Sequence, residues 1–139
     1  MGNEQLNILL ADDDADDRLF FKEAMEEIQI ETMVSVVNDG NELIDYLNHS
    51  NNYLPDIIFL DINMPGKNGL ECLKELREER KFNKILIVIY STSGAESDIQ
   101  EAYRCGANIY LKKAGDFAEL KASLAHVLMD TGAYNQLTR

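Results

Sequence analysis

The chain contains no tryptophan, only two cysteines and two prolines, and no apolar run that approaches the ~20 residues a membrane span needs. Cys72 and Cys105 lie far apart and form no CxxC spacing, so neither a zinc site nor a disulfide framework is expected, and both are interpreted as core or half-buried residues. The amino terminus also lacks the basic start and the small-residue cleavage site of a secretory signal. We therefore expect a cytoplasmic protein that does not enter a membrane.

Positive charge is scarce as well. The 13 Lys and Arg residues are outnumbered by 25 Asp and Glu residues, which gives a formal net charge of −12. Because this charge repels phosphate backbones and anionic lipid, direct binding to nucleic acid or to a membrane surface is not expected. With 139 residues, 45% of them apolar, the chain is expected to form a single domain over residues 1–139, with its core at about 6–130 and a short tail at 131–139.

Apolar runs alternate with amphipathic stretches along the whole chain. The predicted strands are 6–11, 32–37, 57–60, 85–90 and 108–112, and the predicted helices are 15–28, 41–49, 70–80, 95–105 and 116–129. Asp14 is placed to cap the first helix, with Asp17 supporting its first turn, and Ser93 with Glu96 has the spacing of a capping box before the fourth. Strands that are apolar throughout and alternate with helices predict an α/β fold with a parallel sheet covered on both faces.

Polar side chains follow four of the predicted strands. Asp12, Asp13 and Asp14 follow the first strand, Asp61 the third, Ser91, Thr92 and Ser93 the fourth, and Lys112 and Lys113 the fifth. Each residue alone has an ordinary interpretation as a helix cap, a turn residue or a solvated charge. Ligands of such sheets bind outside the carboxyl ends of the strands, however, so the coincidence of all four groups favours a reaction site.

The acidic residues indicate the chemistry of this site. Asp12, Asp13 and Asp61 would repel one another if they converged, unless a divalent cation satisfied them. Oxygen ligands without nearby histidine or cysteine favour a hard ion, above all Mg²⁺. A carboxylate beside Mg²⁺ is a competent nucleophile toward phosphorus, and Lys113 and Ser91 are suited to contact the phosphoryl oxygens. Since no glycine-rich phosphate loop is present, the donor need not be a nucleotide and can be a phosphorylated protein.

In this order and at these strand ends, the residues resemble the receiver domain of two-component response regulators, from Asn7 to about Met129. The resemblance implies a flavodoxin-like, doubly wound sheet of five parallel strands in the order 2-1-3-4-5. It also implies the roles of the acidic pair Asp12 and Asp13, the phosphoacceptor Asp61 in LDINMPGKNG, the switch hydroxyl of Ser91 and the catalytic Lys113.

The resemblance further implies how Mg²⁺ and the phosphoryl lifetime are controlled. The metal ligands would be the side chains of Asp13 and Asp61 and the backbone carbonyl of Asn63, with Asp12 acting largely through water. Asn63 and Ser93 would flank the approach of water to the phosphoryl group, and Thr92 would border access to the site.

Phosphorylation is expected to switch a surface. In the family mechanism Asp61 accepts the phosphoryl group from a phosphohistidine, Ser91 moves toward it and Tyr110 turns inward, which changes the fourth helix, fifth strand and fifth helix at about 95–129. Tyr110 also has a plain interpretation as a strand residue packed on a neighbouring helix. The tail is too short for an output domain, so we expect the protein to act by docking, and the same face offers a surface for a homodimer.

The expected partners are a sensor histidine kinase or a phosphotransfer protein, together with an unidentified downstream target. The stretches DDDADDRLF, STSGAESDIQEAY and GANIYLKK resemble single-domain receivers that serve bacterial phytochromes. Such a protein would catalyse only its own phosphorylation and dephosphorylation. His49 and His126 lie away from the site residues and are not expected to transfer phosphoryl groups.

Two positions depart from, or are ambiguous within, the family pattern. Ala114 stands where the family usually has proline, often with a cis bond, and a non-proline cis peptide costs ~3 kcal/mol. Lys112 neighbours Lys113, and strand alternation lets only one face the site; the register from Gly106 and Tyr110 favours Lys113.

Two rival functions remain. A phosphohydrolase of the haloacid dehalogenase type would carry an acid two residues after its nucleophile, where this chain has Asn63. A receiver-like module that is never phosphorylated would be expected to lose some of the site residues, and only Ala114 supports it.

Overall fold

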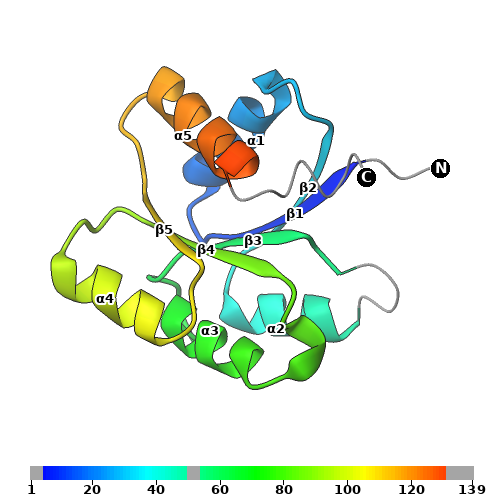
Figure 1. Ribbon diagram of the computed structural model, residues 1–139, viewed down its shortest axis with the longest axis vertical. Coiled ribbons are helices and arrows are strands. Elements are labelled where there is room, and N and C mark those ends of the chain that lie inside the picture. The colour runs from blue at the N-terminus through cyan, green and yellow to red at the C-terminus, as the bar shows by residue number, and fades with distance from the viewer. Residues whose placement is uncertain (1–4, 50–53, 131–139) are drawn as a thin grey trace.

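The computed structural model describes residues 5–49 and 54–130 (Figure 1). Its elements are β1 (Leu6–Ala11), α1 (Ala15–Glu27), β2 (Thr32–Val37), α2 (Gly40–Asn48), β3 (Ile57–Leu60), α3 (Gly69–Arg77), the 3₁₀ helix η1 (Arg80–Phe82), β4 (Leu86–Ser91), α4 (Glu96–Arg104), β5 (Ile109–Lys112) and α5 (Phe117–Asp130). The strands form one parallel sheet in the order β2-β1-β3-β4-β5. The predicted flavodoxin-like topology is confirmed.

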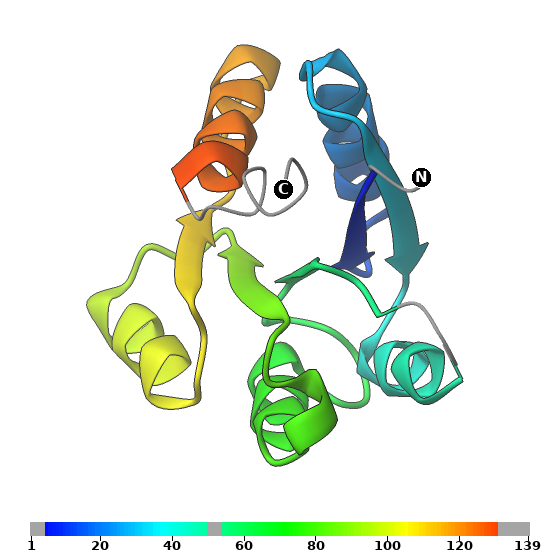
Figure 2. The same ribbon diagram turned by 45° about the vertical axis from the view of Figure 1, so that its right-hand side comes forward.

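Helices cover both faces of the sheet, with α1 and α5 on one side and α2, α3 and α4 on the other (Figures 1 and 2). Successive residues of β1 alternate between the two cores: Ile8 and Leu10 pack on the α1 and α5 side, and Leu9 and Ala11 on the opposite side. All four residues of β3 are fully buried. This double burial is the physical reason why the central strands are apolar throughout.

The helix starts show where local sequence decides the structure. Asp14 caps α1 as predicted, since its side chain accepts hydrogen bonds from the N–H groups of Asp16 and Asp17. The capping box predicted from Ser93 and Glu96 is wrong. The N-cap of α4 is Ala95, and the Ser93 hydroxyl accepts from the Ala95 N–H at 3.1 Å while donating to Asp98 at 2.5 Å. Ser93 therefore lies two residues before the cap and orders the loop instead.

Most other boundaries differ from the prediction by one residue, and the end of α3 differs by three. The helix predicted over 70–80 ends at Arg77, because the chain turns there into the short 3₁₀ helix. The fourth strand runs one residue later than predicted and includes Ser91. Among the helices of the described residues, none has the length and apolar character that a membrane crossing demands.

Candidate functional site

Asp12 and Asp61 are held at the carboxyl edge of the sheet by their own backbones. The Asp12 N–H donates to the Val37 carbonyl at 3.1 Å and the Asp61 N–H to the Ala11 carbonyl at 3.0 Å, so both residues extend the ladders between strands. Both are buried, with exposed fractions of 0% and 6%, whereas Asp13 is exposed. Each of these three aspartates brings a carboxylate oxygen to a cluster in which the oxygens lie within 4.8 Å of one another.

Lys113 supplies positive charge beside this cluster. Its Nζ atom lies 2.7 Å from Asp12 Oδ2, 2.8 Å from Asp17 Oδ2 and 3.6 Å from Asp61 Oδ2, and its side chain is only 9% exposed. Lys112, the last residue of β5, is exposed. The structure thus brings Lys113 rather than Lys112 to the carboxylates.

The peptide after Lys113 is trans, since the described residues contain no cis peptide bond. Ala114 packs against the core between the sheet and α1 and α5. The loop therefore places Lys113 at the site with alanine in the position where the family usually has proline.

Burial dominates the electrostatics of Asp61. It raises the pKa of this carboxyl to about 6; Lys113 opposes the rise, and Asp12 and Asp13 add to it. Burial alone would lower the pKa of Lys113, but its hydrogen bonds to Asp12 and Asp17 raise that pKa overall.

The same charges decide whether a metal fits. Three clustered carboxylates offer only oxygen donors, and the single ammonium group of Lys113 leaves them with excess negative charge. Hard divalent cations prefer such donors. The arrangement of Asp12, Asp13 and Asp61 therefore fits a divalent metal site.

The remaining predicted site residues lie at the carboxyl ends of β3 and β4 and differ in exposure. Ser91 is fully buried, and its hydroxyl oxygen accepts the Ser93 N–H at 3.1 Å. Thr92 is exposed and Ser93 half-buried. Asn63 is exposed, and its N–H points to Asp61 Oδ1 at 3.4 Å.

Tyr110 connects β5 with the loop that follows β4. Its hydroxyl donates to the Ser93 carbonyl at 2.8 Å, and its own N–H donates to the Tyr103 hydroxyl at 3.1 Å. The ring is half-buried and packs against the core on the side of α2, α3 and α4. Tyr110 is therefore bonded to the segment that contains Ser91, Thr92 and Ser93.

The two histidines are exposed and stand near the carboxyl ends of helices. His49 caps α2, with Nδ1 2.8 Å from the Asp45 carbonyl oxygen, and His126 lies in α5. Helices in this fold run antiparallel to the strands, so both residues lie toward the opposite edge of the sheet from Asp61.

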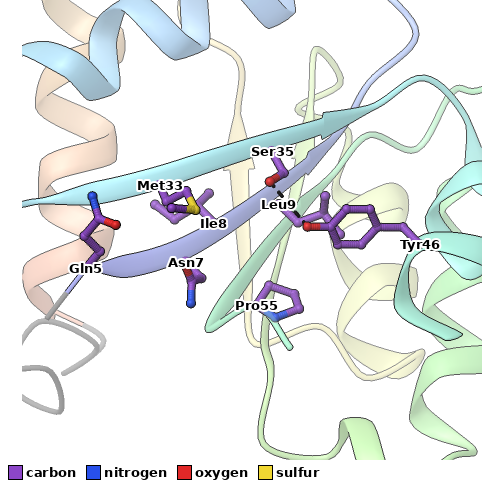
Figure 3. A pocket seen from close by; sticks show the side chains of 8 residues that line it. All are labelled: Gln5, Asn7, Ile8, Leu9, Met33, Ser35, Tyr46 and Pro55. Carbon is purple, nitrogen blue, oxygen red and sulfur yellow. Dashed lines mark hydrogen bonds between the residues drawn. The ribbon is translucent and has the colours of Figure 1, made fainter. Parts of the chain in front are cut away.

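A hollow of about 280 Å³ lies away from these residues, near the amino ends of the strands (Figure 3). Its walls include Asn7, Met33, Pro55 and the Tyr46 hydroxyl, which donates to Ser35 at 3.3 Å. It contains none of the predicted site residues. The site is instead the carboxylate edge at Asp61.

The model of the response regulator receiver domain matches residues 8–125, a span that includes every residue of the edge just described. The chain belongs to this family. The match confirms the predicted receiver domain of response regulators.

Individual relatives agree with the family. The response regulator Rcp1 of Synechocystis sp. (strain PCC 6803) is 29% identical over 117 residues, which span 81% of this receiver and 80% of Rcp1. The crystal structure of the phosphorylated cyanobacterial phytochrome response regulator RcpA has a TM-score of 0.82 at 30% identity, covering 89% of this chain and 91% of RcpA. The Mn²⁺-bound form of Rcp1 has a TM-score of 0.79 at 27% identity, covering 88% and 91%. The predicted likeness to phytochrome response regulators is confirmed.

Two residues that shape this receiver site were not predicted from the sequence to belong to it. A Cβ atom on Gly69 would lie 2.1 Å from the Asp61 carbonyl oxygen, so only glycine fits there. Asp17 was predicted only to support the first turn of α1, yet its carboxylate bonds Lys113. No spacing in the sequence indicates this bond, because it joins residues 96 apart in the chain.

Proposed function

We propose that this receiver accepts a phosphoryl group on Asp61 from a phosphohistidine. The observation that carries the proposal is the buried Asp61 carboxylate, set among Asp12, Asp13 and Lys113 at the open edge of the sheet. In the transfer, an Asp61 oxygen forms the bond to phosphorus while the phosphorus–nitrogen bond of phosphohistidine breaks. The imidazole leaves with the electron pair of that bond and takes up a proton.

Mg²⁺ is the metal that we propose for the acidic cluster. The side chains of Asp13 and Asp61 and the backbone carbonyl of Asn63 would hold it, with Asp12 acting largely through water. When bound, the ion supplies positive charge that screens the incoming anion and stabilises charge on the transferring oxygens. Of the three phosphoryl oxygens, one would lie beside the metal ion. Lys113 pairs with a second oxygen, and the Ser91 hydroxyl donates a hydrogen bond to the third.

The switch follows from the bonds around Ser91. Its hydroxyl oxygen now accepts the Ser93 N–H, and the Ser93 carbonyl accepts the Tyr110 hydroxyl. Movement of Ser91 toward the phosphoryl group alters its bond to the Ser93 N–H. Because the Ser93 carbonyl is bonded to Tyr110, a shift of Ser93 also moves β5. Tyr110 then turns inward, and the surface of α4, β5 and α5 shifts between two conformations.

Loss of the phosphoryl group requires water to attack phosphorus in line. The exposed side chains of Asn63 and Thr92 and the half-buried Ser93 border that approach and tune the lifetime. The protein would catalyse only these reactions of its own aspartate.

The proposed partners are a sensor histidine kinase, of the phytochrome type by likeness to RcpA, or a phosphotransfer protein. Output occurs by docking of the α4, β5 and α5 surface on a target protein, and the same surface would form a homodimer. The net charge of −12 fits protein partners rather than nucleic acid or anionic membranes. We place the protein in the cytoplasm, where kinase domains of two-component systems act.

Phosphoramidate tests this function because it carries the phosphorus–nitrogen bond of phosphohistidine. With Mg²⁺ present, ³¹P NMR should show a new resonance that hydroxylamine abolishes, as expected for an acyl phosphate. EDTA should prevent its formation. A chain that binds Mg²⁺ but gives no acyl phosphate would instead be a docking module that is never phosphorylated.

A further inference from the structure

Asp17 brings a fourth carboxylate to the site, from α1 rather than from the end of a strand. Its Oδ2 atom lies 2.8 Å from Lys113 Nζ, almost as close as Asp12 Oδ2 at 2.7 Å. Asp61 Oδ2 lies 3.6 Å from the same nitrogen, beyond the range of about 2.7–3.2 Å for an N–H···O bond. Lys113 is thus hydrogen-bonded to Asp12 and Asp17 but only ion-paired with the phosphoacceptor.

The position of Asp17 is fixed by the start of α1. Asp14 Oδ1 accepts the N–H groups of Asp16 at 2.9 Å and Asp17 at 3.1 Å. The next residue, Arg18, donates from Nη1 to the Asp12 carbonyl at 2.7 Å. The first turn of α1 is therefore bonded at two points to the segment that follows β1, and the Asp17 carboxylate has a defined place beside Lys113.

Lysine has three N–H donors, and two of those on Lys113 are directed to Asp12 and Asp17. The third donor is left for a phosphoryl group on Asp61, and its direction depends on where the bonds to Asp12 and Asp17 hold the ammonium group. Since Asp17 contacts the ammonium group from α1, its pull competes with that of the phosphoryl oxygens.

We propose that Asp17 is a positioning residue that holds Lys113 away from Asp61 and weakens its contact with a phosphoryl group there. The consequence for phosphorylation depends on the function proposed above. The consequence for the position of Lys113 does not, because it concerns side chains of the unphosphorylated protein. Removing Asp17 should let Lys113 move toward Asp61 before phosphorylation and bind the phosphoryl group more tightly after it.

The experiment compares Asp17→Ala with Asp16→Ala. Both changes remove one carboxylate from the same helical turn and leave the N–H groups that Asp14 caps. Asp16 is exposed, and its carboxylate makes no hydrogen bond or ion pair with any residue between 5–49 and 54–130. It therefore controls for the lost charge and for the altered helix start, and far-UV circular dichroism checks that both variants fold.

Two measurements apply to these variants. The affinity for beryllofluoride, a phosphoryl analogue, is measured by ¹⁹F NMR at saturating Mg²⁺. We expect Asp17→Ala to bind it roughly twofold to fivefold more tightly than the native chain, the scale of one partly exposed ion pair. Crystals of metal-free Asp17→Ala should show Lys113 Nζ within hydrogen-bonding distance of Asp61. Asp16→Ala should match the native chain in both.

The inference is overturned if Asp17→Ala and Asp16→Ala have the same affinity, or if Lys113 keeps its distance from Asp61 in the Asp17→Ala crystal. A native chain that binds no beryllofluoride in the presence of Mg²⁺ contradicts the proposed function instead. In that case the crystal structures alone decide whether Asp17 positions Lys113.

Discussion

Gly69 touches the backbone of Asp61 so closely that a Cβ atom on it would lie 2.1 Å from the Asp61 carbonyl oxygen. The Gly69 N–H also donates to the Ile62 carbonyl at 2.9 Å, which closes the loop from β3 back onto the start of α3. The obstacle is backbone, which cannot rotate aside as a flexible side chain would. The first residue of α3 thus fixes the backbone position of Asp61.

Gly69→Ala should therefore damage both stability and the site. We expect the free energy of unfolding to fall by about 2–4 kcal/mol, because an overpacked backbone contact must shift. Urea unfolding followed by circular dichroism measures this. Gly115→Ala is the matched control, because a Cβ atom there would meet nothing within 4 Å. Equal stability of the two variants would show that the contact at Asp61 relaxes without cost.

Arg77 joins the end of α3 to three other parts of the fold. Its guanidinium donates to the carbonyls of Gly106 at 3.0 Å, Phe82 at 3.3 Å and Ile85 at 3.2 Å, and to Asn108 Oδ1 at 2.7 Å. Burial lowers the pKa of this guanidinium. Gly106 accommodates the overlying side chain, since a Cβ atom there would lie 2.7 Å from Arg77 Cγ, and its φ of +112° is also one that favours glycine.

Arg77→Met should lower the free energy of unfolding by about 2–4 kcal/mol, because the three partly buried carbonyls that it bonds each lose a donor. Arg104→Met is the control. Arg104 lies on α4 with its side chain 67% exposed and pairs with Glu101 in the same helix, a kind of pair worth less than about 0.5 kcal/mol. Chemical denaturation should separate the two variants clearly, and a loss at Arg77 no larger than that at Arg104 would contradict the prediction.

Asp61 should make stability depend on pH in the opposite sense to an ordinary paired carboxylate. Burial raises its pKa from 3.8 to about 6, so the folded protein holds this proton more tightly than the unfolded chain does. The resulting penalty is absent below pH 3.8, grows between pH 3.8 and 6 and is complete above pH 6.

Asp61→Asn should therefore stabilise the metal-free protein at pH 7, by up to about 3 kcal/mol, and change it little at pH 3.5. Urea unfolding in EDTA at the two pH values measures the difference. Asp16→Asn is the control, because it makes the same change at an exposed position on α1. Its effect on the free energy of unfolding should not increase between pH 3.5 and 7. An Asp61→Asn chain that gains no stability between pH 3.5 and 7 would contradict the raised pKa.

The sequence predicts the central sheet well because burial on both faces leaves an unbroken apolar signal. The limits of β1 and β3 match the prediction, since each run ends sharply at a carboxylate, Asp12 or Asp61. The end of α3 does not match, because residues 78–80 are good helix formers whose turn is set by tertiary contacts of Phe82 with the core.

Some residues of the site could likewise be predicted from the sequence, and others could not. Strand ends could be located from the sequence, and with them the aspartates, Ser91 and Lys113. The bond between Asp17 and Lys113 could not, since it joins residues 96 apart and depends on how α1 sits beside the end of β5. The clash that excludes a side chain at Gly69 likewise appears only once β3 and α3 are packed together.

The central claim is that Asp61 is phosphorylated, and intact-mass measurement tests it most directly. The native chain and Asp61→Asn are each incubated with acetyl phosphate, with Mg²⁺ or with EDTA. We predict one phosphoryl adduct, found only in the native chain and only with Mg²⁺. No adduct on a native chain shown separately to bind Mg²⁺, or an equal adduct on Asp61→Asn, would contradict the account.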